Sequence, residues 1–223
     1  MVNGGRINRT GHKILVIFVT AVFLSGCASN SDLKRINREQ AATIASLNKE
    51  VQRLNQELDE LLDSREDLVR AKSDLEQKLQ RELEAGDLSV EMESRGLVVT
   101  VLDRVLFDSG KAELKTSAQA TIDKVAKILG QSVGDNMVYV EGHTDNDPIR
   151  YSGWRSNWEL STGRALEVVH YFIDSASLDP ERFVATGYGE FHPVESNATA
   201  EGKMKNRRVE IVISPKKVAK KVS

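Results

Sequence analysis

Cysteine, proline and aromatic residues are scarce in this chain of 223 residues, which has one cysteine, four prolines and 5% aromatic residues. Because a disulfide needs two thiols, the single cysteine excludes an intramolecular disulfide, and stability must come from packing or from an oligomer. Long apolar runs are also missing. The run from Ile14 to Leu24 has 11 residues, whereas an ordinary membrane-spanning helix needs about 20.

Acidic residues are absent from the first 31 positions, which carry Arg6, Arg9 and Lys13 before the apolar run. A basic start, a short apolar run and small residues are typical of a secretory signal peptide, here residues 1–26. Its removal shifts the formal charge from −2 by three positive charges, to −5. A mildly acidic protein lacks the positive field that gathers phosphates, so we expect no nucleic-acid partner.

The end of this segment, Leu24-Ser25-Gly26-Cys27, resembles the lipobox of bacterial lipoproteins. That resemblance implies a diacylglycerol and an N-acyl chain such as palmitate on Cys27, with no other cofactor, and a lipidated N-terminus at residues 27–30. The alternative is a plain signal peptide with an incidental cysteine, but a lone thiol in an oxidising compartment is prone to intermolecular pairing. Ala28, in place of an aspartate, implies sorting to the outer membrane.

Residues 31–85 predict a coiled-coil spacer. From Ser31 to Glu84 the sequence has no glycine, proline or aromatic residue, and its main residue types are good helix formers. Apolar residues recur at alternating spacings of three and four as far as Leu61, which indicates a heptad seam and therefore a homo-oligomer. They are Ile44, Leu47, Val51, Leu54, Leu58 and Leu61, followed by Leu68, Leu75 and Leu79. A single amphipathic helix packed on the globular domain is the alternative.

Residues 88–214 predict a globular domain of the α+β class, followed by a basic tail, 215–223, which we expect to be disordered. Helical spacing covers Ser117 to Leu129, which Gly130 closes, and Asn157 to Ile173. Strand patterns cover the remaining elements. They are Leu88 to Met92, Gly96 to Leu102, Met137 to Val140, Arg182 to Thr186 and Arg207 to Ile213.

Several short stretches of this domain together resemble the C-terminal domain of OmpA-like proteins, a family that includes the peptidoglycan-associated lipoprotein and the periplasmic part of a flagellar stator protein. The stretches are Leu106-Phe107-Asp108-Ser109-Gly110, Glu141-Gly142-His143-Thr144-Asp145-Asn146, Asn157-Trp158-Glu159-Leu160-Ser161-Thr162-Gly163-Arg164-Ala165, Gly187-Tyr188-Gly189-Glu190 with Pro193, and Asn206-Arg207-Arg208-Val209-Glu210. The resemblance implies a βα/βα/βα-β sandwich without enzymatic activity. It also implies non-covalent binding of the diaminopimelate in the stem peptide of peptidoglycan.

Asp145 and Arg164 are the main candidate binding residues. By resemblance to the family, Asp145 binds the ammonium of diaminopimelate and Arg164 binds its carboxylate. Arginine suits this role because its planar fork matches a carboxylate bidentately. The alternatives are that Asp145 only caps a turn and that Arg164 only pairs with Glu167 on the helix surface.

Other residues accompany this pair. Asn157 is a candidate helix N-cap that in the family also shapes the ligand loop, while Thr144 and Leu160 are expected to line the pocket. Arg207 continues the core-facing parity of its strand, and a charge on that face needs a partner. Arg207 is therefore either a supporting residue behind the site or a member of an internal salt bridge. Phe107 and Asp108 match a family position near the pocket. Trp154 and Trp158 either stack on a glycan ring or, as we favour, pack beneath a loop.

The sequence thus predicts an outer-membrane lipoprotein that tethers the membrane to the cell wall from the periplasmic side. A stator-like component is the alternative, but it requires a spanning helix with an ionisable residue, which Ile14 to Leu24 lacks. An enzyme requires a nucleophile–base or acid–acid pair, and no such pattern is evident. His143 with Asp145 provides too few ligands for a closed zinc site, so we expect no metal.

Overall fold

The computed structural model describes residues 9–150 and 152–216, with side chains from residue 30 onward. The predictions of a signal peptide and of lipidation at Cys27 therefore fall outside the residues whose side chains are described, as does the tail beyond Lys216. The chain divides into two compact units, residues 1–57 and residues 58–223.

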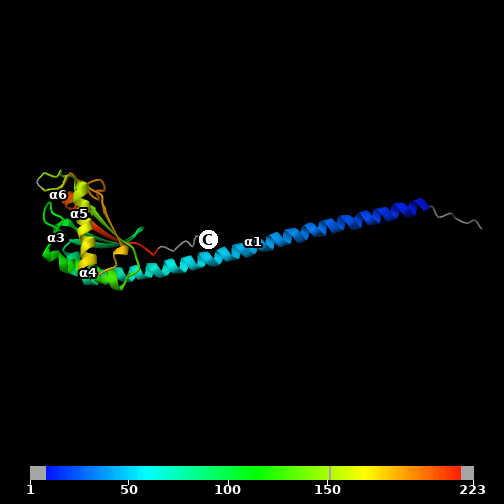
Figure 1. Cartoon of the computed structure of the whole chain (residues 1–223), viewed down its shortest axis with the longest axis horizontal. Helices are drawn as coiled ribbons and strands as arrows, with labels where there is room; N and C mark the ends of the chain where they lie inside the picture. The colour runs from blue at the N-terminus through cyan, green and yellow to red at the C-terminus, as the bar shows by residue number, and fades with distance from the viewer. Residues whose placement is uncertain (1–8, 151, 217–223) are drawn as a thin grey trace, which may run out of the picture. The chain divides into compact units, whose positions relative to one another are not determined.

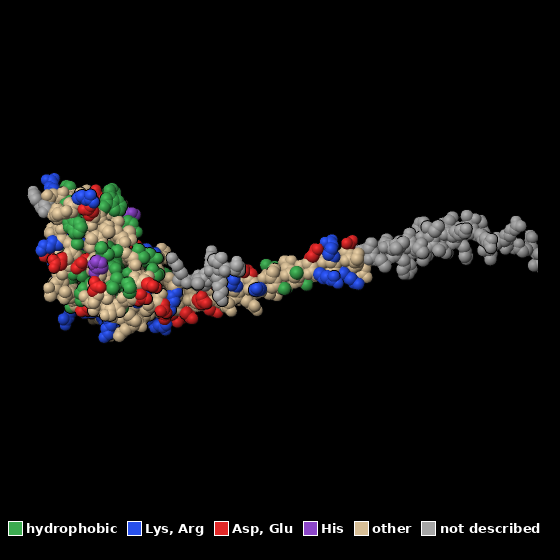
Figure 2. Space-filling view, in the orientation of Figure 1, with side chains coloured by type: hydrophobic (Ala, Val, Ile, Leu, Met, Phe, Trp, Pro, Cys, Tyr) green, Lys and Arg blue, Asp and Glu red, His purple; other side chains and the backbone are tan. Residues whose placement is uncertain are grey.

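A long helix, α1 (Arg9–Lys78), runs through the first unit and into the second (Figure 1). In the first unit its apolar seam residues, among them Leu47, Val51 and Leu54, are exposed to solvent in the single chain. Figure 2 shows charged side chains of both signs along this helix, with hydrophobic side chains exposed between them. Within the part of the chain that the structure describes, no helix has the length and apolar character needed to cross a membrane.

In the second unit, the end of α1 belongs to the globular domain. Leu68, Ala71, Leu75 and Leu79 are completely or almost completely buried and join the domain's hydrophobic core. The sequence predicts a spacer that ends near residue 85, whereas the structure places residues from Leu58 onward in the domain unit. The physical reason is that a helical stripe can be buried by any apolar surface, and here the core of the same chain covers it.

The domain is built on one five-stranded sheet of order β1-β2-β5-β3-β4, in which only the β3–β4 pair is parallel. The strands are β1 (Leu88–Glu93), β2 (Gly96–Leu102), β3 (Val138–His143), β4 (Phe183–Gly187) and β5 (Arg208–Ile213). The helices are α2 (Gln80–Glu84), α3 (Asp103–Leu106), α4 (Thr116–Gln131), α5 (Asn157–His170) and α6 (Ala200–Asn206), with a π-turn at Tyr171–Ser175 and a 3-10 turn at Pro180–Arg182.

After the β1–β2 hairpin, the element order alternates strand and helix and ends in a strand, which confirms the predicted α+β class and the βα/βα/βα-β order. Boundaries differ in detail. Gly130 does not close its helix, because α4 continues to Gln131. The second long helix is α-helical only to His170 and then widens into the π-turn.

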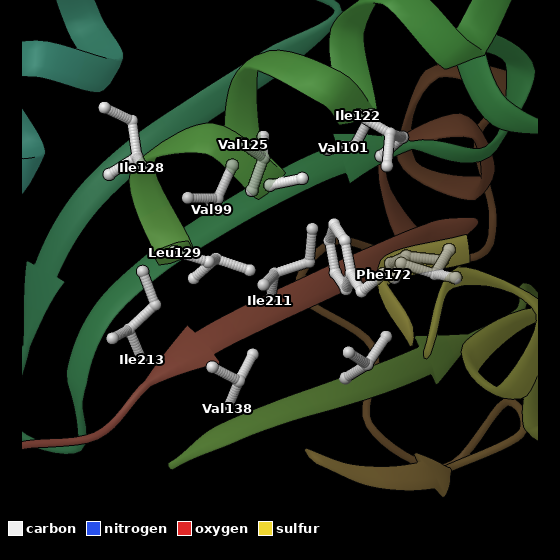
Figure 3. Close-up of a cluster of buried hydrophobic side chains, with 14 of the residues drawn as sticks. Val99, Val101, Ile122, Val125, Ile128, Leu129, Val138, Phe172, Ile211 and Ile213 are labelled. Carbon is white, nitrogen blue, oxygen red and sulfur yellow. The ribbon is translucent and has the colours of Figure 1, made fainter. Parts of the chain in front are cut away.

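The core lies between the sheet and the helices that pack on one of its faces. Val99, Val138 and Ile211 project from the sheet toward Val125 of α4 and toward Phe172 (Figure 3). Helix α5 lies so close to β3 that a Cβ on Gly142 would stand 2.1 Å from the backbone oxygen of Ser161. Glycine at this position therefore allows α5, which carries Arg164, to sit directly on the strand that leads to Asp145.

Candidate functional site

An open pocket of about 1100 Å³ lies where the loops after β2 and β3 meet the start of α5. All seven binding residues predicted from the sequence line this pocket. They are Asp108, Thr144, Asp145, Asn157, Leu160, Arg164 and Arg207. The carboxyl-terminal ends of strands are common ligand sites in α/β sheets, and the pocket occupies this position for β2 and β3.

Asp145 follows β3 by two residues, as the strand pattern predicts, and its side chain is buried. Two backbone hydrogen bonds hold its loop. The Thr144 N–H donates to the Gly189 carbonyl oxygen at 2.9 Å, and the Asp147 N–H donates to Asp145 Oδ1 at 3.1 Å. The second bond forms an Asx turn, so Asp145 does cap a turn, but its other carboxylate oxygen pairs with Arg207 across the pocket.

Arg164 lies about two turns into α5 and is only 2% exposed. Its Nε donates to the Lys111 carbonyl oxygen at 2.9 Å, and its guanidinium lies 5.2 Å from the centre of the Phe107 ring. Its charge is balanced by Asp103, since Nη2 of Arg164 is 3.0 Å from Asp103 Oδ1. The predicted alternative of a surface pair with Glu167 does not describe this buried side chain.

Asp103 is the site residue that the sequence analysis missed. It begins α3 directly after β2, and the signal available was an acidic residue immediately after an apolar strand. Burial raises the pKa of Asp103, and the positive charges of Arg164 and Arg207 partly offset this increase. Burial also lowers the pKa of Arg164, which Asp103 partly offsets. Each charge is therefore tolerated because the other is present.

Arg207 follows α6 and precedes β5, instead of beginning the strand as predicted. Of the two predicted roles, the internal salt bridge is observed, with the Asp145 carboxylate. The Arg207 carbonyl oxygen also accepts a hydrogen bond of 2.9 Å from the Asp103 N–H. We call Asp103, Arg164, Asp145 and Arg207 the charge quartet: two anions and two cations from four separate segments, joined in two ion pairs.

Asn157 is the first residue of α5 and is not its N-cap. Ser156 takes that position and accepts a hydrogen bond from the Glu159 N–H. The amide nitrogen of Asn157 donates instead to the Asp147 carbonyl oxygen at 3.1 Å and to Glu190 Oε2 at 2.6 Å. Asn157 therefore ties the Asp145 loop to the loop after β4, while Leu160, one turn further on, forms a buried wall of the pocket.

Basic groups predominate at the pocket, with six basic and four acidic side chains among its lining residues. The basic residues are Arg104, Lys111, Lys115, Arg150, Arg164 and Arg207. Asp108 stands exposed at the rim, 3.4 Å from Lys111 Nζ and 3.6 Å from Lys115 Nζ. This excess of positive charge in an acidic protein favours a ligand that carries carboxylates.

A second buried charge cluster lies on the face of the sheet that points away from the hydrophobic core. Glu141, His143 and Glu210 bring three possible metal ligands within 4.8 Å of one another. Arg95 Nη1 lies 2.5 Å from Glu141, and Arg208 Nε lies 2.6 Å from Glu210. The two arginines already neutralise the carboxylates and disfavour a cation. Burial, reinforced by the positive charge of Arg208, lowers the pKa of His143 to about 3.

Comparisons with known proteins agree with this fold. A sequence model described as the OmpA family matches residues 106–207. This range contains all seven predicted binding residues, of which Arg207 is the last. The cell wall anchor of the T6SS from Pseudomonas aeruginosa superposes with a TM-score of 0.58 at 35% identity, covering 64% of this chain and 97% of that one. Residues 106–207 therefore form an OmpA-family domain.

Two curated proteins are also similar to this chain. Motility protein B of Bacillus subtilis is 40% identical over 154 residues, which are 69% of this chain and 59% of the relative. The probable lipoprotein YiaD of Escherichia coli is 35% identical over 140 residues, 63% of this chain and 61% of the relative. The chain thus spans about three fifths of the length of these relatives. By name these proteins are a cell wall anchor, a motility protein and a lipoprotein, and none is named as an enzyme.

Proposed function

We propose that this chain is a lipid-anchored tether that holds the outer membrane to the cell wall by binding the diaminopimelate of peptidoglycan stem peptides in the pocket. An envelope structural role is supported by its OmpA-family domain and by its similarity to a cell wall anchor. The ligand, the lipid anchor and the membrane are the parts that we add.

The charge quartet is the observation that carries the proposal. The free end of diaminopimelate bears an ammonium and a carboxylate on one carbon, so its site needs a fixed anion and a fixed cation close together. Asp145 and Arg164 are held in place by Arg207 and Asp103, respectively, before any ligand arrives. Because their orientation is fixed in advance, binding loses less conformational entropy than it would with mobile side chains.

Charge-assisted hydrogen bonds of this kind contribute roughly 1.5–3 kcal/mol each. A single stem peptide is therefore bound modestly, and a polymeric wall that offers many stems to an oligomer adds avidity. The exposed seam of α1 supplies the means to form that oligomer.

Sacculus binding by the purified full chain tests the proposal. We expect Asp145→Asn and Arg164→Ala each to weaken binding roughly 10- to 100-fold, which is the equivalent of 1.5–3 kcal/mol. Arg164→Lys should recover little because lysine lacks the bidentate fork. Asp135→Asn, whose carboxylate is exposed and is not a lining residue of the pocket, is the matched control.

The same assay should show weaker binding to lysine-type walls, whose side chain lacks the second carboxylate, and weaker binding with added salt. Circular dichroism must confirm that each variant is folded. If Arg164→Ala does not fold, Asp145→Asn alone tests the site. Folded Asp145→Asn protein that retains sacculi as tightly as the wild type would overturn the proposed site.

A stator-like component of an ion-driven machine remains the second candidate, favoured by the 40% identity to motility protein B over 154 residues. The two candidates differ at Cys27, since a lipid anchor requires acylation there and a stator component requires a spanning helix. Labelling with palmitate separates them.

A further inference from the structure

Two large aromatic side chains lie stacked and exposed beside the pocket. Trp158 is 48% exposed and Phe191 is 60% exposed, and their ring centroids are 5.2 Å apart with an angle of 22° between the ring planes. Single exposed apolar residues are normal, but neighbouring ones that form a patch mark binding surfaces. We call this pair the aromatic platform. Trp154, in contrast, donates a hydrogen bond from Nε1 to the Gly110 carbonyl oxygen at 3.0 Å. The sequence favours packing beneath a loop for both tryptophans, and for the exposed Trp158 that prediction is wrong.

The platform is joined to the pocket by two chain segments. Trp158 follows Asn157, Phe191 follows Glu190, and Asn157 and Glu190 are joined by the 2.6 Å hydrogen bond. Consecutive Cα atoms are about 3.8 Å apart, so the backbone of the platform lies beside that of Asn157, a lining residue of the pocket, although neither ring lines the pocket itself.

The loop beneath the platform is fixed by Gly189. This residue has φ of +56°, and a Cβ there would stand 3.5 Å from both aromatic rings. Its carbonyl oxygen accepts the Thr144 N–H that holds the Asp145 loop. One residue therefore positions the platform on one side and the anionic group of the pocket on the other.

Next to Trp158 is a shallow hollow of about 370 Å³, lined by Trp154, Trp158, Glu159, Thr162 and Gly163. Its aromatic walls match a sugar ring, which presents apolar C–H faces. The Glu159 carboxylate accepts hydrogen bonds from Arg155, and Thr162 Oγ1 donates to the Trp158 carbonyl oxygen. Stacking on the aromatic faces is therefore the contact that the hollow supplies.

We propose that the aromatic platform and the adjoining hollow bind a sugar ring of the peptidoglycan glycan strand, while the stem peptide of the same strand occupies the pocket. This inference rests on the proposed function. The glycan is the occupant to expect because it is covalently joined to the peptide, so binding of the peptide raises its local concentration at the platform.

The test compares three ligands on the folded full chain by calorimetry: a free diaminopimelate-containing stem peptide, the disaccharide alone, and the disaccharide joined to that peptide. We expect the wild type to bind the joined ligand at least about fivefold more tightly than the free peptide. Trp158→Ala and Phe191→Ala should reduce this ratio toward one and leave the affinity for free peptide within about twofold. Leu166→Ala, an exposed apolar residue on the same helix, should retain the ratio.

Asp145→Asn distinguishes this inference from the proposed function. It should weaken free and joined peptide equally and leave the ratio unchanged. A wild-type ratio of one, or an unchanged ratio in both folded platform variants, would overturn the sugar site and leave the exposed pair to a protein partner. Wild-type protein that binds disaccharide through Trp158 but binds no free peptide would overturn the pocket assignment and support the platform.

Discussion

Asp103 is buried in the charge quartet beside Arg164, and the charge of either residue would be costly to bury without the other. Removing one member of a buried ion pair leaves an uncompensated charge, which is more costly than the pair itself. The quartet is therefore a structural feature as well as a binding feature, and its members divide by function. Asp145 and Arg164 are placed to contact the ligand, whereas Asp103 and Arg207 position them.

We predict that Asp103→Asn lowers the free energy of unfolding by about 3–5 kcal/mol, because it leaves the Arg164 charge buried without its counter-ion. Urea unfolding measures this change. Asp87→Asn is the control, since Asp87 pairs with the half-exposed Arg104 at 2.9 Å and exposed pairs contribute only about 0–1 kcal/mol. Equal small effects of the two substitutions would contradict the buried-pair account.

His143 predicts a dependence of stability on pH. Burial lowers its pKa from 6.5 to about 3, so the unfolded chain binds a proton near pH 6.5 that the folded protein does not accept until near pH 3. The contribution of His143 to the free energy of unfolding is fully present above pH 6.5. It decreases as the pH falls toward 3, by at most about 1.4 kcal/mol per pH unit.

The measurement is urea unfolding at pH 7 and pH 5 for the wild type, His143→Gln and the exposed control His170→Gln. Between these pH values the wild type and the control should lose about 2 kcal/mol more than His143→Gln does. Comparing variants cancels the opposite contributions of Glu141 and Asp103, whose pKa values burial raises. The same loss in His143→Gln would show that another group is responsible.

Helix α1 carries one apolar stripe whose two parts differ in burial. Its upstream residues, such as Leu54, are exposed, while Leu75 is buried in the core of the domain. We predict that Leu54→Lys abolishes self-association of the full chain without changing the unfolding of the domain, because a charge in a coiled-coil seam is costly. Leu75→Ala should do the reverse and lower the unfolding free energy by about 2–5 kcal/mol.

Sedimentation equilibrium and urea unfolding, applied to both variants, separate the two effects. A wild-type chain that is monomeric at every practical concentration would refute the coiled coil. Loss of stability in Leu54→Lys would indicate that the upstream stripe also packs on the domain.

The limits of prediction from the sequence are instructive for this helix and for the pocket. Heptad spacing predicted a helix correctly, but Leu68, Leu75 and Leu79 keep a spacing that fits either a second chain or the core of their own chain. Asp145, Asn157 and Arg164 were found because the stretches that contain them resemble those of the OmpA-like family. Asp103 was not, because its partner Arg164 lies 61 residues away and only the folded sheet brings them together.

The proposed attachment of the whole molecule to a membrane depends on Cys27. We predict that Cys27→Ala abolishes labelling by radioactive palmitate and releases the protein from the membrane fraction, because no acyl chain can then attach. Fractionation of the bacterial envelope measures the second effect. Label that persists in the variant, or that is missing from the wild type in a bacterial host, would defeat the lipid anchor and favour the stator-like candidate.

The burial of α1 in the domain has a mechanical consequence. From Ser31 to Glu84 the chain has no glycine or proline, and the contacts of Leu68, Leu75 and Leu79 with the core extend over about three helical turns. A pull along α1 therefore reaches the domain through packed side chains instead of through a slack loop. To separate the helix from the domain, the force must extract several leucines at once. The attachment of α1 to the domain is therefore suited to carrying load.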